Sequence, residues 1–135
     1  MSEGGREEPR WLTPGQVRML HAETVRLFGG APGVRDEGLL RSALARPRHR
    51  WTYGEAVSLF ALAAAYASGI ARNHPFVDGN KRTALLSIRA FLFWNGYRFL
   101  PDEAATVSMM EGLAAGRVEE DELASWIEAS STRMA

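Results

Sequence analysis

Two strongly apolar segments in the middle of the chain constrain its fold more than any other feature. In residues 55–72, alanines and larger apolar side chains lie all around the helix axis instead of along one stripe, and residues 80–94 show the same distribution. A helix of this kind is buried on all sides. Seven residues, 73–79, join the two segments, a length typical of antiparallel neighbours in helical bundles. The sequence therefore predicts a central antiparallel helix pair.

Four further segments have the signals of outer helices. The first begins with a capping box at Thr13 and Gln16 and ends at Gly29. The others are expected over residues 36–47, with Pro47 ending the helix, over 102–115 and over 119–130. Residues 48–54 mix arginine with aromatic and β-branched side chains, and we expect an extended flap there. No segment alternates with the period of two that a strand requires. The predicted fold class is all-α, a compact helical bundle of about six helices around the central pair.

Length and composition define the organisation of the chain. With 135 residues, it has the length of a single domain. Residues 1–10 are polar and contain two glycines and a proline, so we expect a flexible N-terminal arm there and the domain over residues 11–135. The chain has no cysteine, which excludes a zinc ribbon, a thiol nucleophile and a disulfide framework.

Charge and hydropathy argue against two classes of partner. The 16 basic and 16 acidic side chains cancel, which disfavours attachment to nucleic acid or an anionic membrane by overall charge. The longest apolar stretch, 56–71, is interrupted by two serines and is too short to cross a bilayer comfortably. No apolar signal segment opens the chain. We therefore expect a cytoplasmic protein with no direct nucleic-acid partner and no membrane association.

The connection between the two central helices carries an unusual density of chemical groups. Residues 74–82 read His-Pro-Phe-Val-Asp-Gly-Asn-Lys-Arg, and Lys81 is the single lysine in a chain with 15 arginines. A helix N-terminus offers free N–H groups and the positive end of the helix dipole, where anions bind. Lys81 and Arg82 oppose that dipole by themselves, so their position indicates that an anion is expected between them.

Four residues of this segment have the properties of phosphate binders. Gly79 can adopt φ > 0 and let the backbone pass close to a phosphate. Asn80 can either cap the second helix or hold the loop in shape. Lys81 and Arg82 can neutralise phosphate oxygens.

The two remaining polar residues supply metal binding and proton transfer. Asp78 is the candidate Mg²⁺ ligand, because this ion favours one or two carboxylates together with phosphate oxygens and water. His74 is the candidate general base, because an imidazole can accept a proton near neutral pH.

Structural interpretations compete with these roles. A lone histidine before a proline often only ends a helix, and Asp-Gly-Asn is an ordinary turn; the combination favours a phosphate site. For Phe76 we expect a structural role, as an anchor of the loop in the core. We expect His21 and His49 on the surface or on a helix face. Four further side chains are expected in the core: Trp94, Met109, Met110 and Trp126.

Residues 74–82 match the signature H-x-F-x-D-x-N-K-R. Through this signature the chain resembles the Doc (death-on-curing) toxins, which are the compact branch of the Fic superfamily. The resemblance extends from residues 12–14 through 29–40 to 95–97. It implies an all-α Fic fold and a kinase that uses ATP and Mg²⁺ to phosphorylate a threonine of elongation factor Tu, which arrests translation. By residue, it implies His74 as base, Asp78 as metal ligand, and Asn80, Lys81 and Arg82 as phosphate binders.

Two alternative functions stay open beside the kinase. Larger Fic proteins transfer AMP with the pattern H-x-F-x-[D/E]-G-N-G-R-x-x-R, from which this chain departs at Lys81 and Leu85. A lysine fills the space that a glycine leaves for a diphosphate, and a leucine cannot grip phosphates as an arginine does. These departures favour phosphorylation. The second alternative is a catalytically silent binding module, which intact His74 and Asp78 disfavour.

The resemblance also implies a partner. Many Fic proteins are inhibited by a helix that carries S/T-x-x-x-E-G/N, but here Val107 stands at the first position before Glu111. Control by a Phd-type antitoxin, whose disordered tail folds into a groove on the toxin as a helix, is therefore expected. We expect a basic patch of Arg41, Arg46 and Arg48 to meet the acidic side of that tail.

Overall fold

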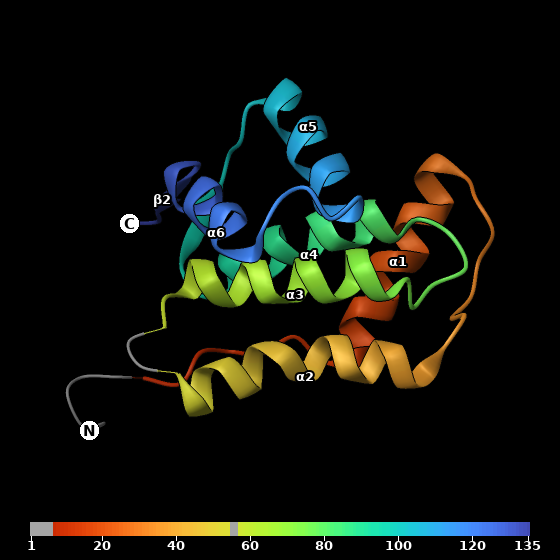
Figure 1. The fold of residues 1–135 in the computed structure, drawn as a ribbon, viewed down its shortest axis with the longest axis horizontal. Helices are drawn as coiled ribbons and strands as arrows, with labels where there is room; N and C mark the ends of the chain where they lie inside the picture. The colour runs from red at the N-terminus through yellow and green to blue at the C-terminus, as the bar shows by residue number, and fades with distance from the viewer. Residues whose placement is uncertain (1–6, 55–56) are drawn as a thin grey trace.

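The computed structural model describes residues 7–54 and 57–135, which form six helices and one small two-stranded sheet (Figure 1). The helices are α1 (Pro14–Phe28), α2 (Glu37–Tyr53), α3 (Leu59–Asn73), α4 (Asn80–Trp94), α5 (Glu103–Ala114) and α6 (Glu120–Ala129). The strands are β1 (Tyr97–Phe99) and β2 (Ser131–Arg133). The predicted all-α class and the number of helices are confirmed.

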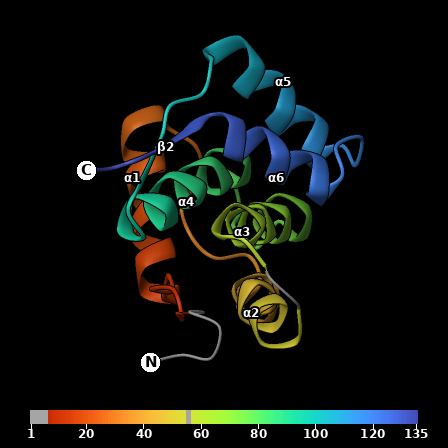
Figure 2. The same cartoon turned by 90° about the vertical axis from the view of Figure 1, so that its left-hand side faces the viewer.

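α3 and α4 form the predicted central pair. Every residue from 62 to 71 in α3 is buried. Figure 2 views α3 nearly along its axis and shows α2, α4 and α6 around it. Large apolar side chains from these helices make one core, among them Leu40, Tyr66, Ile70, Phe91, Leu92, Leu123 and Ile127. The loop between α3 and α4 is therefore presented at the end of a well-packed helix pair.

The start and the end of α1 follow the sequence signals. The Thr13 hydroxyl accepts a hydrogen bond from the Gln16 N–H (3.2 Å), and the Gln16 side chain accepts one from the Thr13 N–H (2.8 Å). The helix ends at Phe28, after which Gly29 adopts φ of 80°. The predicted capping box and the predicted end of the helix are confirmed. The two glycines that follow α1, Gly29 and Gly30, lie beside the α3–α4 loop.

The prediction that Pro47 ends the second helix is wrong, and so is the extended flap. α2 continues through Pro47 to Tyr53, although a proline removes one hydrogen bond of a helix interior. Pro47 is buried, so the core compensates for the missing bond. The turns around Pro47 are also tied to α6, because Arg46 and Arg50 both pair with Glu120. Tertiary packing overrides the local signal here.

The first central helix begins later than the apolar pattern predicted. Ser58 caps α3 by accepting a hydrogen bond from the Ala61 N–H (3.0 Å), and the helix starts at Leu59. Glu55 and Ala56, which were expected to open this helix, lie outside the described residues. Within the described residues, the Ser58 cap therefore sets the start of α3. The apolar pattern of the sequence did not indicate this boundary.

The small sheet was not predicted. β1 and β2 pair antiparallel, with Tyr97 opposite Arg133 and Phe99 opposite Ser131. Each strand has three residues, too few to show a period of two. The pairing places the end of the described chain beside the segment that follows α4.

The predictions for single side chains have mixed outcomes. Met110 is buried, and Met109 and Trp126 pack against the core. The core position expected for Trp94 is wrong, because this side chain is 41% exposed. It lines an apolar groove between α1 and α4 with Met19 and Phe93, among other residues.

Two observations concern the beginning of the chain and its relation to membranes. Residues 1–6 of the expected arm lie outside the described residues. The backbone of Arg10 is paired with Asn95, whose side chain both accepts from the Arg10 N–H (2.8 Å) and donates to its carbonyl oxygen (3.0 Å). None of the helices in the described ranges combines the length and the apolar character needed to span a bilayer.

Candidate functional site

The α3–α4 loop begins and ends in the left-handed backbone conformation. His74 is the C-cap of α3, with φ of 50° and ψ of 56°. Gly79 is the N-cap of α4, with φ of 76°. The expected positive φ of Gly79 is confirmed, and the position is also crowded, because a Cβ there would lie 3.3 Å from Thr24 Cγ2. Glycine therefore fits this position in both conformation and size.

Phe76 and Asn80 hold the middle of the loop in shape. Phe76 is 1% exposed, which confirms its expected role as an anchor in the core. The side-chain amide of Asn80 accepts a hydrogen bond from the Phe76 N–H (3.0 Å) and donates one to the Phe76 carbonyl oxygen (3.0 Å). Of the two roles considered for Asn80, the structure therefore assigns it that of holding the loop.

His21 of α1 supports the loop from outside. Of the two positions expected for this histidine, the structure shows a helix face and not the surface, because His21 lies in α1 and its side chain is 4% exposed. Its ring stacks on Phe76 with the centroids 3.9 Å apart, and Nε2 lies 2.8 Å from the Asp78 carbonyl oxygen. The Nε2–H tautomer can donate to that oxygen. His49 is exposed on α2, in agreement with the sequence analysis.

The first turn of α4 is available to an anion. Among the described residues no side chain caps this helix, and its first turn contains no acidic residue. The first turn contains Lys81 and Arg82 instead. The Arg82 guanidinium lies 3.8 Å from the centre of the Phe28 ring, at the end of α1, and both cations are exposed. Free N–H groups, the helix dipole and two cations thus coincide at one point.

The predicted site residues share one pocket of about 480 Å³. It is lined by His74, residues 77–82 and, from the end of α1, Thr24, Phe28, Gly29 and Gly30. All six residues named as candidates from the sequence are therefore brought together. The α1 residues of the wall were not predicted. The pair Gly29-Gly30 was the available signal, because two adjacent glycines after a helix allow the close approach of another segment.

Asp78 faces the glycines that follow α1. One carboxylate oxygen of Asp78 accepts from the Gly79 N–H (2.9 Å), and the other lies 3.4 Å from the Ala31 nitrogen. A Cβ on Gly30 would lie 2.8 Å from the Asp78 carboxylate. The carboxylate is exposed and retains lone pairs for a ligand.

The donor set suits Mg²⁺ but not a metal held by protein ligands alone. Within the described ranges no group of three or more histidine, aspartate or glutamate side chains could hold a metal ion. Mg²⁺ commonly binds one or two carboxylates and takes its remaining ligands from phosphate and water. Asp78 beside the uncapped start of α4 fits that pattern.

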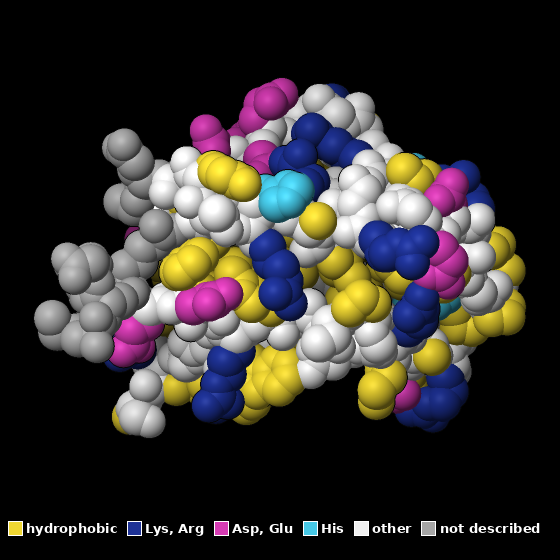
Figure 3. All heavy atoms as spheres, turned by 90° about the horizontal axis from the view of Figure 1, so that it is seen from below, with side chains coloured by type: hydrophobic (Ala, Val, Ile, Leu, Met, Phe, Trp, Pro, Cys, Tyr) yellow, Lys and Arg dark blue, Asp and Glu magenta, His cyan; other side chains and the backbone are white. Residues whose placement is uncertain are grey.

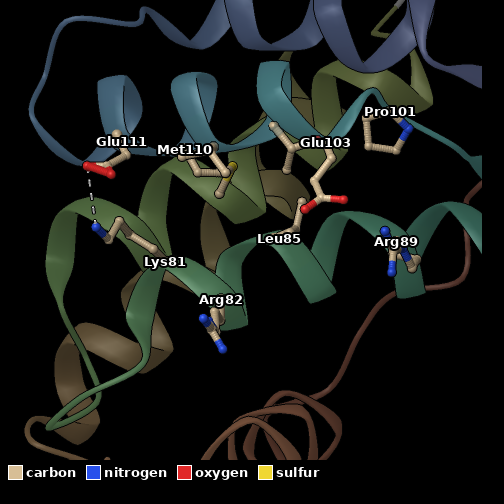
Figure 4. Close-up of a pocket in the computed structure, with 10 residues that line it drawn as sticks. Lys81, Arg82, Leu85, Arg89, Pro101, Glu103, Met110 and Glu111 are labelled. Atoms are coloured by element: carbon tan, nitrogen blue, oxygen red, sulfur yellow. Dashed lines mark ion pairs between the residues drawn. The ribbon is translucent and has the colours of Figure 1, made fainter. Parts of the chain in front are cut away.

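A second pocket of about 510 Å³ lies between α4 and α5 (Figure 4). Leu85 and Met110 form part of its wall, and Lys81 and Arg82 border both pockets. Lys81 Nζ lies 3.8 Å from the Glu111 carboxylate, whereas Arg82 is directed away from α5 (Figure 4). The two cations therefore separate a polar cavity beside the loop from a more apolar one beside α5.

The three arginines of the basic patch expected on the second helix do not share one face. Arg46 pairs with Glu120, and the Arg48 guanidinium lies 5.3 Å from the Trp11 ring centre. At about 100° per residue, Arg41 and Arg46 lie on different faces of α2, whereas Arg41 and Arg48, seven residues apart, lie on the same face. The molecular face on which α2 lies shows basic side chains scattered among hydrophobic, neutral and acidic ones (Figure 3).

Comparisons with known proteins agree on one family. The family model described as Fic/DOC matches residues 11–92, a range that contains every residue of the pocket beside the loop. The chain is 35% identical to the protein kinase doc of Escherichia phage P1 over 109 residues, which are 81% of this chain and 86% of that protein. It is 47% identical to the toxin Doc of Mycolicibacterium smegmatis over 77 residues, 56% of this chain and 58% of that protein.

Proposed function

The chain belongs to the Fic/DOC family, and on this premise we propose that it is the toxin of a type II toxin–antitoxin system, an ATP-dependent protein kinase that acts in the cytoplasm. Its substrate in this proposal is a threonine hydroxyl of elongation factor Tu, whose phosphorylation arrests translation. The names of the two relatives, a protein kinase and a toxin, support the general part of the proposal.

One observation carries the chemistry of the proposal. His74, Asp78, Lys81 and Arg82 line a single pocket at the start of α4, a helix that no described side chain caps. A base, a carboxylate, two cations and free N–H groups are the parts that phosphoryl transfer from a nucleotide requires.

Each residue has a defined task in this reaction. His74 accepts the proton of the threonine hydroxyl as its oxygen bonds to the γ-phosphorus and the bond to the bridging oxygen of ADP breaks. Lys81, Arg82 and the N–H groups of the first turn of α4 stabilise charge on the phosphate oxygens. Asp78 would hold Mg²⁺, which would supply further charge neutralisation at the phosphates.

Transfer of AMP is the second candidate, because the loop and the helix start could bind ATP in either orientation. Two residues favour the kinase. Lys81 stands where the AMP-transfer pattern has a glycine, and Leu85 stands where it has an arginine. Leu85 is half-buried and lines the pocket beside α5, so it offers no group for the outer phosphates.

Labelled ATP distinguishes these candidates. The purified protein is incubated with elongation factor Tu, Mg²⁺ and ATP labelled at either the α or the γ phosphate. We expect label from γ alone on a threonine of the target. Label from α would make the protein an AMP transferase, and no label from either position would favour a different target or a binding module.

The proposal includes a Phd-type antitoxin as the neutralising partner. Expression of the chain alone in a bacterium is expected to stop growth, and co-expression of its antitoxin is expected to restore growth. High yield of the wild-type chain without toxicity would contradict the toxin proposal, provided that the same cells express the His74→Ala variant equally well.

A further inference from the structure

The backbone at His74 needs an external support. Among the described residues, His74 is the single non-glycine residue with positive φ. A left-handed conformation is unfavourable for a residue with a Cβ and persists where the surroundings enforce it. His74 is exposed, so packing of its own side chain does not provide that support.

Arg35, in the segment between α1 and α2, contacts this turn directly. Its Nε donates to the His74 carbonyl oxygen (2.7 Å), and its Nη2 donates to the Asn73 carbonyl oxygen (2.9 Å). The carbonyl groups in the last turn of a helix lack partners within the helix and carry the negative end of its dipole. A single guanidinium therefore satisfies the carbonyl groups of the two peptides that flank the His74 Cα atom.

Backbone hydrogen bonds between the segment around Arg35 and the α3–α4 loop hold the same turn. The Arg35 N–H donates to the Pro75 carbonyl oxygen (2.7 Å), and the Val77 N–H donates to the Gly33 carbonyl oxygen (3.1 Å). Val34 and Phe76 form an isolated antiparallel bridge between these hydrogen bonds. Arg35 thus reaches His74 from a segment that is itself paired with the loop.

We propose that Arg35 is a positioning residue for His74, which holds the backbone of the catalytic base in its left-handed conformation and thereby aims the imidazole at the pocket. Arg35 does not line that pocket, so it acts through His74 and not on the nucleotide. The inference rests on the proposed role of His74. The planar fork of arginine, with two donors at fixed spacing, suits two adjacent carbonyl groups better than the single ammonium of lysine.

Arg72 provides a matched control. Its guanidinium also donates to two backbone carbonyl groups, those of Val118 (2.8 Å) and Leu113 (3.5 Å), but these belong to the α5–α6 region. Arg35→Ala and Arg72→Ala therefore remove the same side chain and the same kind of hydrogen bond. Thermal unfolding of both variants shows whether their losses of stability are comparable.

Kinetics separate positioning from a general loss of structure. Arg35→Ala is expected to lower kcat for γ-phosphate transfer about 10²-fold, the effect of misplacing a catalytic group by about 1 Å, with KM for ATP unchanged. Added methylguanidine is expected to restore part of kcat in this variant. Arg72→Ala is expected to keep the wild-type kcat, and Arg35→Lys to fall between. Equal kcat in Arg35→Ala and wild type, or equal losses in both alanine variants, would overturn the proposal.

The conformation of His74 is measured without any assay of activity. The three-bond coupling between its amide and α protons reports φ, and it is expected to change in Arg35→Ala but not in Arg72→Ala. An unchanged coupling overturns the role of Arg35. If the wild-type protein transfers no phosphate while the coupling changes, the proposed function fails and the structural role of Arg35 stands.

Discussion

His74 has to satisfy two requirements at one position. Its side chain lines the pocket beside Asp78, and its backbone ends α3 in a left-handed turn. Its neighbours in the loop serve the second requirement, because Phe76 and Asn80 fix the loop while Gly79 leaves room for α1. The chemistry of the site is therefore carried by exposed side chains on a backbone that is held from several directions.

Replacement of the base tests the proposed chemistry. His74→Ala is expected to reduce γ-phosphate transfer by about 10²–10⁴-fold, the usual contribution of a general base. The protein should remain folded, because the His74 side chain is exposed. Transfer rates and circular dichroism are compared with those of His49→Ala, which removes an exposed histidine from α2. Wild-type rates in the His74 variant would rule out the proposed role.

The glycine beside Asp78 is expected to matter for the use of Mg²⁺. Gly30→Ala places a Cβ 2.8 Å from the Asp78 carboxylate, at a position with φ of 108°. The carboxylate has to shift, so we expect a higher Mg²⁺ concentration for half-maximal transfer. Gly96→Ala is the control, because Gly96 has φ of 93° and a Cβ at this position would meet nothing within 4 Å. The same Mg²⁺ dependence in both variants would contradict this reading of Gly30.

At the scale of helices and strands, burial determined which of the sequence-based predictions were correct. The apolar surface of residues 62–71 predicted α3 as the central helix, and all of these residues are buried. Pro47 misled the prediction because its local effect is outweighed by a buried position and by the ion pairs of Arg46 and Arg50 with Glu120. β1 and β2 escaped prediction because three-residue strands show no periodicity and depend on a partner far along the chain.

The close approach of α2 and α3 depends on one glycine. A Cβ on Gly69 would lie 2.9 Å from the Cα and Cβ atoms of Ala43. Because backbone atoms cannot yield as a flexible side chain does, Gly69→Ala is expected to lower the free energy of unfolding by about 1–3 kcal/mol. Gly15→Ala, in the exposed first turn of α1, should be neutral or stabilising by up to about 1 kcal/mol. Urea denaturation measures both, and equal stability of the two variants would show that α2 can move away.

At the scale of the whole molecule, the site is made where three separate parts of the chain meet. Residues 74–82 were identified from the sequence because their chemistry is contiguous. The buried position of His21 was not predicted because its partner Asp78 is 57 residues away, a relation that no local pattern contains. Phe28 and Gly30, which line the pocket, and Arg35, which contacts the His74 turn, were missed for the same reason. The chemical groups were therefore predictable, whereas the surroundings that position them required the fold.

The attachment of Leu12 to Tyr66 of α3 predicts that the protein becomes less stable as the pH rises into the alkaline range. Tyr66 of α3 is fully buried, and its hydroxyl accepts from the Leu12 N–H (2.9 Å). Burial raises the pKa of Tyr66 from 10.0 to about 12. The unfolded chain thus loses this proton first as the pH rises, so the stabilisation is complete below pH 10 and is lost between pH 10 and 12. By a pH of about 11 the loss should reach about 1 kcal/mol.

Tyr66→Phe isolates this contribution from the other groups that titrate in the same range. At a pH of about 8, where the wild-type phenol is protonated in both states, the variant is expected to be less stable by about 1–3 kcal/mol, because the buried Leu12 N–H loses its acceptor. Between pH 8 and 11 its free energy of unfolding should fall less steeply than that of the wild type, since phenylalanine has no proton to lose. Urea denaturation across this range provides both curves. If the two curves fall in parallel, Tyr66 does not control the alkaline stability, and the attachment of Leu12 to α3 does not depend on the protonated phenol.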